Sequence, residues 1–266
     1  MNSPALPSPD WIAFLNGSSP LPQLGVIQAQ GEDAANFLHN QLTNDVLLLP
    51  VGQSRLAAFC NAKGRMQASF VLTKTAPDTV LLVMRHDLLA QTLKRLSMFV
   101  LRAKVKLNDA SGQWQLRGLL GGSAKAVLDD AAPWQTVAVD GAHVVALYPA
   151  VVADVQVPRA LWLAPAGSAL PTSSEVMPEV WSWSEVMSGV ALVSQPVFEA
   201  FVPQMLNYES VGGVNFKKGC YPGQEVVARS QFRGTLKRRT ALVHSPVALA
   251  PGQDVFTPTD PEQPCA

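Results

Sequence analysis

The sequence contains little cysteine, and this shortage excludes several classes of protein. Among its 266 residues only Cys60, Cys220 and Cys265 carry thiols. Because three widely spaced cysteines give no disulfide framework, the composition indicates a protein of the reducing cytoplasm. The same three thiols are too few to hold an iron–sulfur cluster without help from another chain.

Net charge and long apolar runs are missing as well. The chain has 20 basic and 20 acidic residues, so no overall field steers it toward nucleic acid. Apolar runs such as residues 80–84 are far too short to cross a membrane. The four histidines are scattered without the spacing of a metal site. We therefore expect no bound metal, no membrane association and no direct nucleic-acid binding.

What the chain does have is enough apolar sequence to fold, with 48% hydrophobic and 15% charged residues. Its periodicities predict strands at 24–30, 55–60, 65–74, 79–84 and 102–107. They also predict a helix at 31–46 and a second helix that ends at residue 100 and that Asp87 could cap. A second set of strands with a short helix follows between 114 and 165. This rhythm predicts an α+β fold of two similar lobes.

The ends of the chain differ from this body. Residues 1–22 are rich in proline and serine and predict an arm that docks through Trp11 and Phe14. The body is expected at 23–240, with a lobe boundary near 108–113. Residues 241–266 are too few for an independent domain, although 240–245 has the pattern of a strand.

A cysteine in the stretch NFKKGCYPGQEVVARSQFRG, residues 215–234, is the strongest functional signal. Lys217 and Lys218 place positive charge beside Cys220, which favours the reactive thiolate form. Gly219 leaves room for a ligand to approach the backbone. The alternative is that Cys220 is a small buried hydrophobic residue, as isolated cysteines often are.

The residues after this cysteine allow two interpretations. Pro222-Gly223 predicts a turn, and Gln224 with Glu225 offers the donors and acceptors that would read the edge of a pterin-like heterocycle. Equally, Gln224 and Glu225 could cap a helix, and Tyr221 could be a packing residue.

The segment FKKGCYPGQEVVAR resembles the motif of the YgfZ family, folate-binding relatives of the glycine-cleavage T-protein, an aminomethyltransferase. The likeness extends to FVPQMLNYESVGGVN before the motif and to the blocks GEDAANFLHNQLTNDV and AAFCNAKGRMQASFVL. It covers roughly residues 24 to 240. Several blocks in the same order make this a specific signal.

The resemblance implies a T-protein-like α+β fold of interleaved ferredoxin-like lobes, with at most a remnant of the C-terminal β-barrel in 241–266. It implies tetrahydrofolate, or a derivative, in a central opening, and support for the assembly or repair of iron–sulfur clusters in client enzymes, including a tRNA-modifying one. Cys220 and Lys218 fall on the positions expected to be catalytic. The expected cofactor-binding residues are Tyr221, Gln224, Glu225, Asn207 and Arg229.

Two other functions stay open. A folate-dependent one-carbon (aminomethyl) transferase needs a positioned carboxylate; Asp87 lies near the place of the acidic residue of the T-protein, but a helix cap explains it as well. A non-enzymatic interaction domain could use the basic stretch 229–239. That stretch could contact RNA, place positive charge on an exposed strand edge and so prevent its pairing with other chains, or neutralise the glutamate tail of folate.

Overall fold

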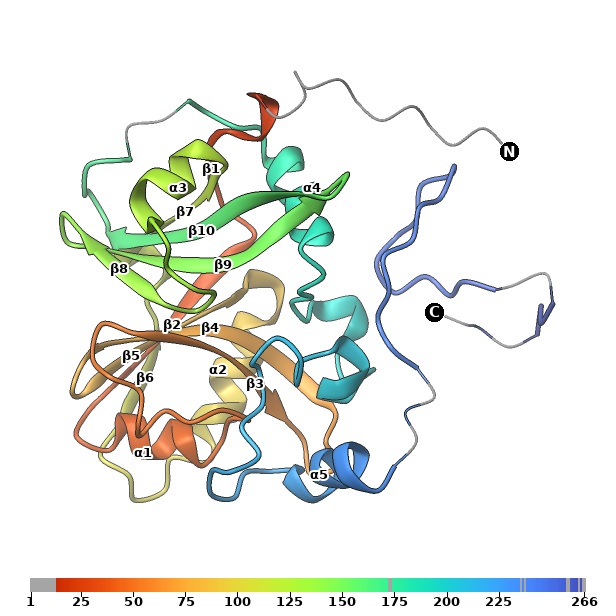
Figure 1. Ribbon diagram of the computed structural model, residues 1–266. Helices are drawn as coiled ribbons and strands as arrows, with labels where there is room; N and C mark the ends of the chain where they lie inside the picture. The colour runs from red at the N-terminus through yellow and green to blue at the C-terminus, as the bar shows by residue number, and fades with distance from the viewer. Residues whose placement is uncertain are drawn as a thin grey trace.

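The computed structural model describes residues 13–171, 174–234, 236, 238–256, 259–262 and 264. Trp11, Cys265 and Lys237 of the basic stretch 229–239 lie outside these residues. Two five-stranded sheets face each other at the centre of the molecule, and helices lie on their outer sides (Figure 1). The α+β class is therefore confirmed.

The lower sheet in Figure 1 has the strand order β3-β4-β5-β2-β6. Its strands are β2 (Leu24–Gln30), β3 (Ser54–Cys60), β4 (Met66–Ala76), β5 (Thr79–Arg85) and β6 (Lys106–Asp109). The predicted hairpin is confirmed, because β3 pairs antiparallel with β4 across a turn at 61–64. The strand predicted at 102–107 starts later, since β6 pairs with β2 only from Lys106 onward.

The upper sheet has the order β1-β7-β10-β9-β8. Its strands are β1 (Gly17–Pro20), β7 (Trp114–Leu120), β8 (Thr136–Val139), β9 (Ala142–Val152) and β10 (Val155–Pro165). The chain passes from the lower to the upper sheet between Asp109 and Trp114. Strand β1 precedes every strand of the lower sheet in the sequence, yet it pairs with β7 of the upper sheet. The two lobes are therefore interleaved.

The two sheets are held together by apolar side chains from both inner faces. These include Val26, Val71, Leu81 and Val83 from the lower sheet and Leu120, Val145, Leu161 and Leu163 from the upper sheet. Trp181 of helix α4 (Pro178–Met187) completes this layer and is 1% exposed. A Cβ atom on Gly118 would lie 2.2 Å from the Trp181 ring, so glycine is required there.

The outer helices bury apolar faces against the sheets. Helices α1 (Ala34–His39) and α2 (Leu89–Ser97) cover the lower sheet, and α3 (Gly122–Leu128) covers the upper one (Figure 1). Helix α5 (Gln224–Phe232) begins within the cysteine motif, directly after the turn at Pro222-Gly223. It buries Val227 in the same core as α1 and α2, which brings the motif to the lower lobe.

The helix predicted at 31–46 is wrong beyond His39, where α1 ends. The carbonyl groups of His39 and Leu42 accept hydrogen bonds from Lys218 instead of continuing a helix. Thr43 donates to the carbonyl of Gly213 and accepts from the amide of Ala58. Side-chain bonds to the backbone therefore replace the helical ladder after His39.

Two predictions about local contacts are also wrong. Asp87 does not cap α2, because its carboxylate accepts a hydrogen bond from the amide of Gln195 at 3.0 Å. Phe14 does not dock, since 74% of its surface is exposed, whereas the neighbouring Leu15 is buried. Leu15, rather than Phe14, is thus the apolar side chain that anchors this part of the chain.

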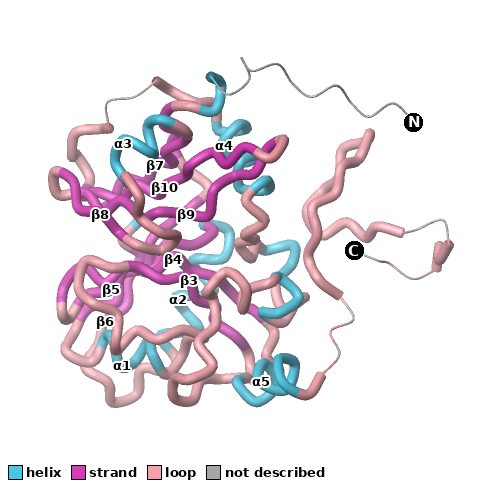
Figure 2. The backbone as a smooth tube through the Cα atoms, in the orientation of Figure 1, coloured by secondary structure: helices cyan, strands magenta, loops and turns pink. Residues whose placement is uncertain are grey.

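The C-terminal segment carries no regular element over the described residues 238–256 (Figure 2). The strand predicted at 240–245 is therefore wrong. The backbone amide and hydroxyl groups of Thr240 both donate to the carbonyl of Met205, which ties this segment to the body. Among the described residues, no helix has the length and apolar character needed to span a bilayer.

Candidate functional site

The motif lysine closes the end of helix α1. Lys218 is 8% exposed, and its Nζ donates hydrogen bonds to the carbonyl groups of His39 and Leu42, the latter at 2.8 Å. Nζ also lies 4.8 Å from the centre of the Tyr221 ring. Burial lowers the pKa of Lys218 to about 8, while the negative charges of Asp45 and Cys220 oppose this shift.

A histidine and a carboxylate accompany this lysine. Nδ1 of His39 lies 3.3 Å from Oδ1 of Asp45. Burial and the charge of Lys218 lower the pKa of His39, and Asp45 opposes them. Nε2 of His39 lies 3.6 Å from the place where a Cβ atom of Gly219 would be. The backbone before Cys220 is therefore held next to a buried set of charged and titratable groups.

Cys220 is an exposed, free thiol. The interpretation of Cys220 as a buried hydrophobic residue is wrong. Cys60 is the contrasting case, because it is 1% exposed and burial raises the pKa of its thiol to about 12. Of the two described cysteines, only Cys220 can meet a partner at the surface.

The turn after the cysteine packs on the turn of the β3–β4 hairpin. Gly223 has φ of +79°, and a Cβ atom there would lie 2.4 Å from the carbonyl oxygen of Asn61. A Cβ atom on Gly64 would lie 3.1 Å from Val226 of α5. Both turns need glycine for close approach and left-handed backbone, so two motifs far apart in the sequence form one structure.

The predicted cofactor-binding residues lie in two places. Tyr221 is buried against Lys218, and burial raises its pKa. Glu225 and Arg229 are exposed on α5 and pair with each other at 2.9 Å. Asn207 instead donates to the carbonyl of Thr240 at 3.1 Å. The roles of these residues and of Gln224 in cofactor binding stay predictions.

Two arginines of the basic stretch 229–239, Arg229 and Arg239, pair with carboxylates. Besides the Glu225–Arg229 pair, Arg239 pairs with Glu209 at 2.6 Å and donates to Asn207 at 2.8 Å. Arg238 donates to the carbonyl of Pro264. The Arg239 contacts hold the C-terminal segment on the body, and a role of this stretch in binding RNA or folate stays a prediction.

A cavity of about 520 Å³ lies between helix α4, the segment 189–194 and the C-terminal segment. Its lining contains Arg85, Ser182, Glu185, Val186, Gly189, Val190, Ala191, Leu192, Ser194, Thr240, Ala241, Leu242 and Pro251. Burial raises the pKa of Glu185, and the charges of Arg159 and Arg85 oppose it. Nε of Arg85 is buried without a hydrogen-bond partner among the described residues.

The residues of this cavity fit a reduced folate. The apolar wall suits a ring system, the Glu185 carboxyl group suits the donor edge of a pterin, and the unpaired Arg85 nitrogen suits a carboxylate. Cys220 is not in the lining, so the described residues do not place the thiol at the rim of this cavity. Asn207 contributes indirectly, because it holds Thr240 in the wall.

Glu185, His39 and Asp45 were not predicted as site residues from the sequence. Glu185 belongs to a helix whose apolar pattern gave no reason to single out one carboxylate. His39 and Asp45 lie in the segment that was predicted as one continuous helix, although the polar run Thr43–Asp45 is typical of a turn. Within the described residues, no group of three or more possible metal ligands occurs.

Comparison with known proteins identifies the family of this chain. A family model for the GCVT N-terminal domain matches residues 21–161. The chain is 32% identical over 232 residues to the tRNA-modifying protein YgfZ of Photobacterium profundum, covering 82% of this chain and 67% of the relative. It is 30% identical over 244 residues to the YgfZ protein of Cronobacter sakazakii, covering 85% and 70%.

A solved structure gives the same fold. The glycine cleavage system aminomethyltransferase T from Bartonella henselae superposes with a TM-score of 0.67 over 86% of this chain and 68% of that one, at 17% identity. The described residues thus form the interleaved lobes of a T-protein without a closed barrel. The chain belongs to the YgfZ family and has the fold of the aminomethyltransferase T-protein.

Proposed function

We propose that this protein binds tetrahydrofolate, or a derivative, and supports the assembly or repair of iron–sulfur clusters in client enzymes. Relatives named as tRNA-modifying proteins make an enzyme of tRNA modification a reasonable client class. The observation that carries the proposal is that the exposed thiol of Cys220 lies two residues after the buried, hydrogen-bonded side chain of Lys218.

The thiol and the cavity have separate tasks in this proposal. The cavity lined by Arg85 and Glu185 binds the folate, whose reduced pterin would supply one-carbon or redox chemistry when bound. Cys220 faces solvent, where a client can reach it. Lys218 fixes the loop by its two carbonyl contacts, so that the thiol is held in one place.

Tetrahydrofolate binding is tested by titration with tryptophan fluorescence as the readout, since Trp181 lies on the helix that carries Ser182 and Glu185. Arg85→Gln is expected to weaken binding by about tenfold or more, because a charge-assisted hydrogen bond is lost. Arg102→Gln, an exposed position outside the cavity lining, is the matched control. Equal affinity of both variants and wild type would contradict this assignment.

The role of the thiol is tested in a bacterial strain that lacks its own YgfZ protein. Cys220→Ala is expected to retain the fold and to keep tetrahydrofolate affinity within about twofold, yet fail to restore the activity of iron–sulfur enzymes. Cys60→Ala removes a buried thiol and should restore that activity. Full rescue by Cys220→Ala would reject the proposal.

A folate-dependent aminomethyl transferase is the second candidate, and Glu185 is the observation that favours it. Its carboxyl group lines the cavity, and burial raises its pKa, so it can hold a proton inside a folate-sized space. Under this alternative, Glu185→Gln abolishes methylene transfer, whereas Cys220→Ala leaves transfer intact. Transfer activity that survives Glu185→Gln would exclude Glu185 as the acid–base group.

A further inference from the structure

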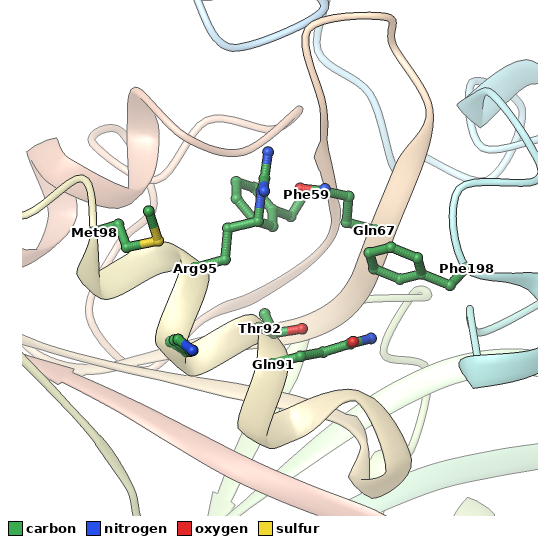
Figure 3. Close-up of a pocket in the computed structure, with 8 residues that line it drawn as sticks. Phe59, Gln67, Gln91, Thr92, Arg95, Met98 and Phe198 are labelled. Atoms are coloured by element: carbon green, nitrogen blue, oxygen red, sulfur yellow. The ribbon is translucent and has the colours of Figure 1, made fainter.

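A second cavity, of about 250 Å³, lies between helix α2 and the end of the β3–β4 hairpin (Figure 3). It is lined by Phe59, Gln67, Gln91, Thr92, Lys94, Arg95, Met98 and Phe198. None of these residues lines the 520 Å³ cavity or belongs to the cysteine motif. Its chemistry can therefore be considered independently of folate and of the thiol.

Two buried polar atoms in this cavity have no partner. Thr92 and Gln67 are each 2% exposed. Thr92 Oγ1 and Gln67 Oε1 form no hydrogen bond with any of the residues that the structure describes. The amide of Gln67 is fixed in orientation, because its Nε2 donates to Glu199 at 2.6 Å. Its Oε1 is thus a pure acceptor, and a ligand that satisfies it must bring an N–H or O–H donor.

The backbone is distorted where these side chains meet. In the β3–β4 pair, Phe59 is opposite Ala68 and Cys60 is opposite Met66, so Gln67 is the extra residue of a bulge. Bulges turn a side chain away from its regular direction and are frequent beside binding sites. Glu199, which holds Gln67, has φ of +58°, a conformation that non-glycine residues rarely adopt.

The remaining walls combine one aromatic ring with positive charge. The half-buried Phe198 presents its ring, whereas Phe59 is 1% exposed and packs edge-on against Phe99. The side chains of Phe59, Gln67 and Arg95 converge above α2 (Figure 3). Lys94 and Arg95 also line the cavity, and neither forms an ion pair with a carboxylate of the described residues. Rings suit a planar ligand, and free cations suit an anion.

We propose that this cavity binds a planar heteroaromatic anion that carries an N–H donor, of the chemical class of a nucleoside monophosphate. The base lies against Phe198 and donates to Gln67 Oε1. The phosphate lies at the rim with Arg95 and Lys94. This inference goes beyond the proposed function and does not depend on it, because it uses no residue of the folate cavity or of the thiol loop.

The experiment is isothermal titration of the full chain with AMP, adenosine, inorganic phosphate and a short single-stranded oligoadenylate. We expect AMP to bind more than about tenfold tighter than adenosine or phosphate alone, because the ring and the anion have separate partners. Binding of the oligoadenylate at least as tight as that of AMP assigns the site to nucleotides within RNA, and weaker binding assigns it to free nucleotides. If AMP binds no tighter than phosphate, the proposal is overturned.

Variants then locate the binding. Arg95→Gln is expected to weaken AMP binding by about tenfold or more, whereas Arg102→Gln on the following loop should not change it. Thr92→Val removes the unpaired hydroxyl group at nearly constant volume and is expected to weaken AMP binding by about fivefold without lowering the melting temperature. A Thr92→Val protein that melts earlier and binds AMP normally would show a structural role and overturn the assignment.

Discussion

Replacement of Lys218 by methionine tests the buried ammonium group directly. The Lys218→Met change replaces the apolar stem of the side chain but removes the terminal amine, which leaves the carbonyl groups of His39 and Leu42 without their donor. Each unpaired carbonyl costs about 1–3 kcal/mol. The folded variant, however, no longer buries a charge. The lowering of the Lys218 pKa from 10.5 to about 8 corresponds to a cost of about 3 kcal/mol at neutral pH.

These effects oppose each other. At pH 7 the variant should therefore lie between about 1 kcal/mol more stable and about 3 kcal/mol less stable than the wild type. The difference should then depend on pH. Because the folded-state pKa of Lys218 is below the unfolded one, the unfolded chain binds more protons between them, and wild-type stability rises from about pH 8 upward. The neutral amine retains two N–H groups, which is enough for both carbonyls.

The measurement is urea-induced unfolding followed by tryptophan fluorescence at several pH values. Between about pH 8 and pH 9.5, the wild type should gain about 2 kcal/mol relative to Lys218→Met. Lys217→Met is the matched control, because Lys217 is the exposed neighbour and should show no such trend. If the difference in unfolding free energy between wild type and Lys218→Met stays constant or shrinks as pH rises, burial does not lower the pKa of Lys218.

Two further predictions follow from burial and packing. In a Cys265→Ser background, a thiol reagent such as dithionitrobenzoate should modify Cys220 in the native protein and Cys60 only after unfolding; rapid native labelling of Cys60 would contradict the structure. Gly118→Ala should lower the free energy of unfolding by about 2–3 kcal/mol, because its Cβ would lie 2.2 Å from the Trp181 ring. Gly112→Ala, where nothing lies within 4 Å of the new atom, is the control, and an equal loss in both variants would show that the ring contact is not the cause.

The sequence predicts those features that short patterns determine. Apolar residues that alternate in the sequence from Met66 to Leu72, with a turn before them, suffice to predict the β3–β4 hairpin. The sequence does not show that both faces of these strands are buried. The cysteine motif was visible for the same reason, because its residues are contiguous. Helix α1 shows the limit: its early end depends on Lys218 and Gly213, which lie far along the chain.

The candidate cavities were not predictable in this way. Arg85, Glu185 and Thr240 meet in one wall although they come from a strand, a helix and a loop. No local periodicity marks a residue whose importance arises only when distant segments pack. The bulge at Gln67 is similar, since its effect on side-chain direction depends on pairing with the neighbouring strand.

The hydrogen bonds of Lys218 join positions that are 179 and 176 residues apart in the chain. During synthesis α1 and the strands of the lower sheet emerge well before the cysteine loop that contacts them. A nascent or damaged chain in which these elements have not folded offers the lysine no carbonyls and leaves the loop unordered. The position of the Cys220 thiol therefore depends on whether the rest of the lobe has folded.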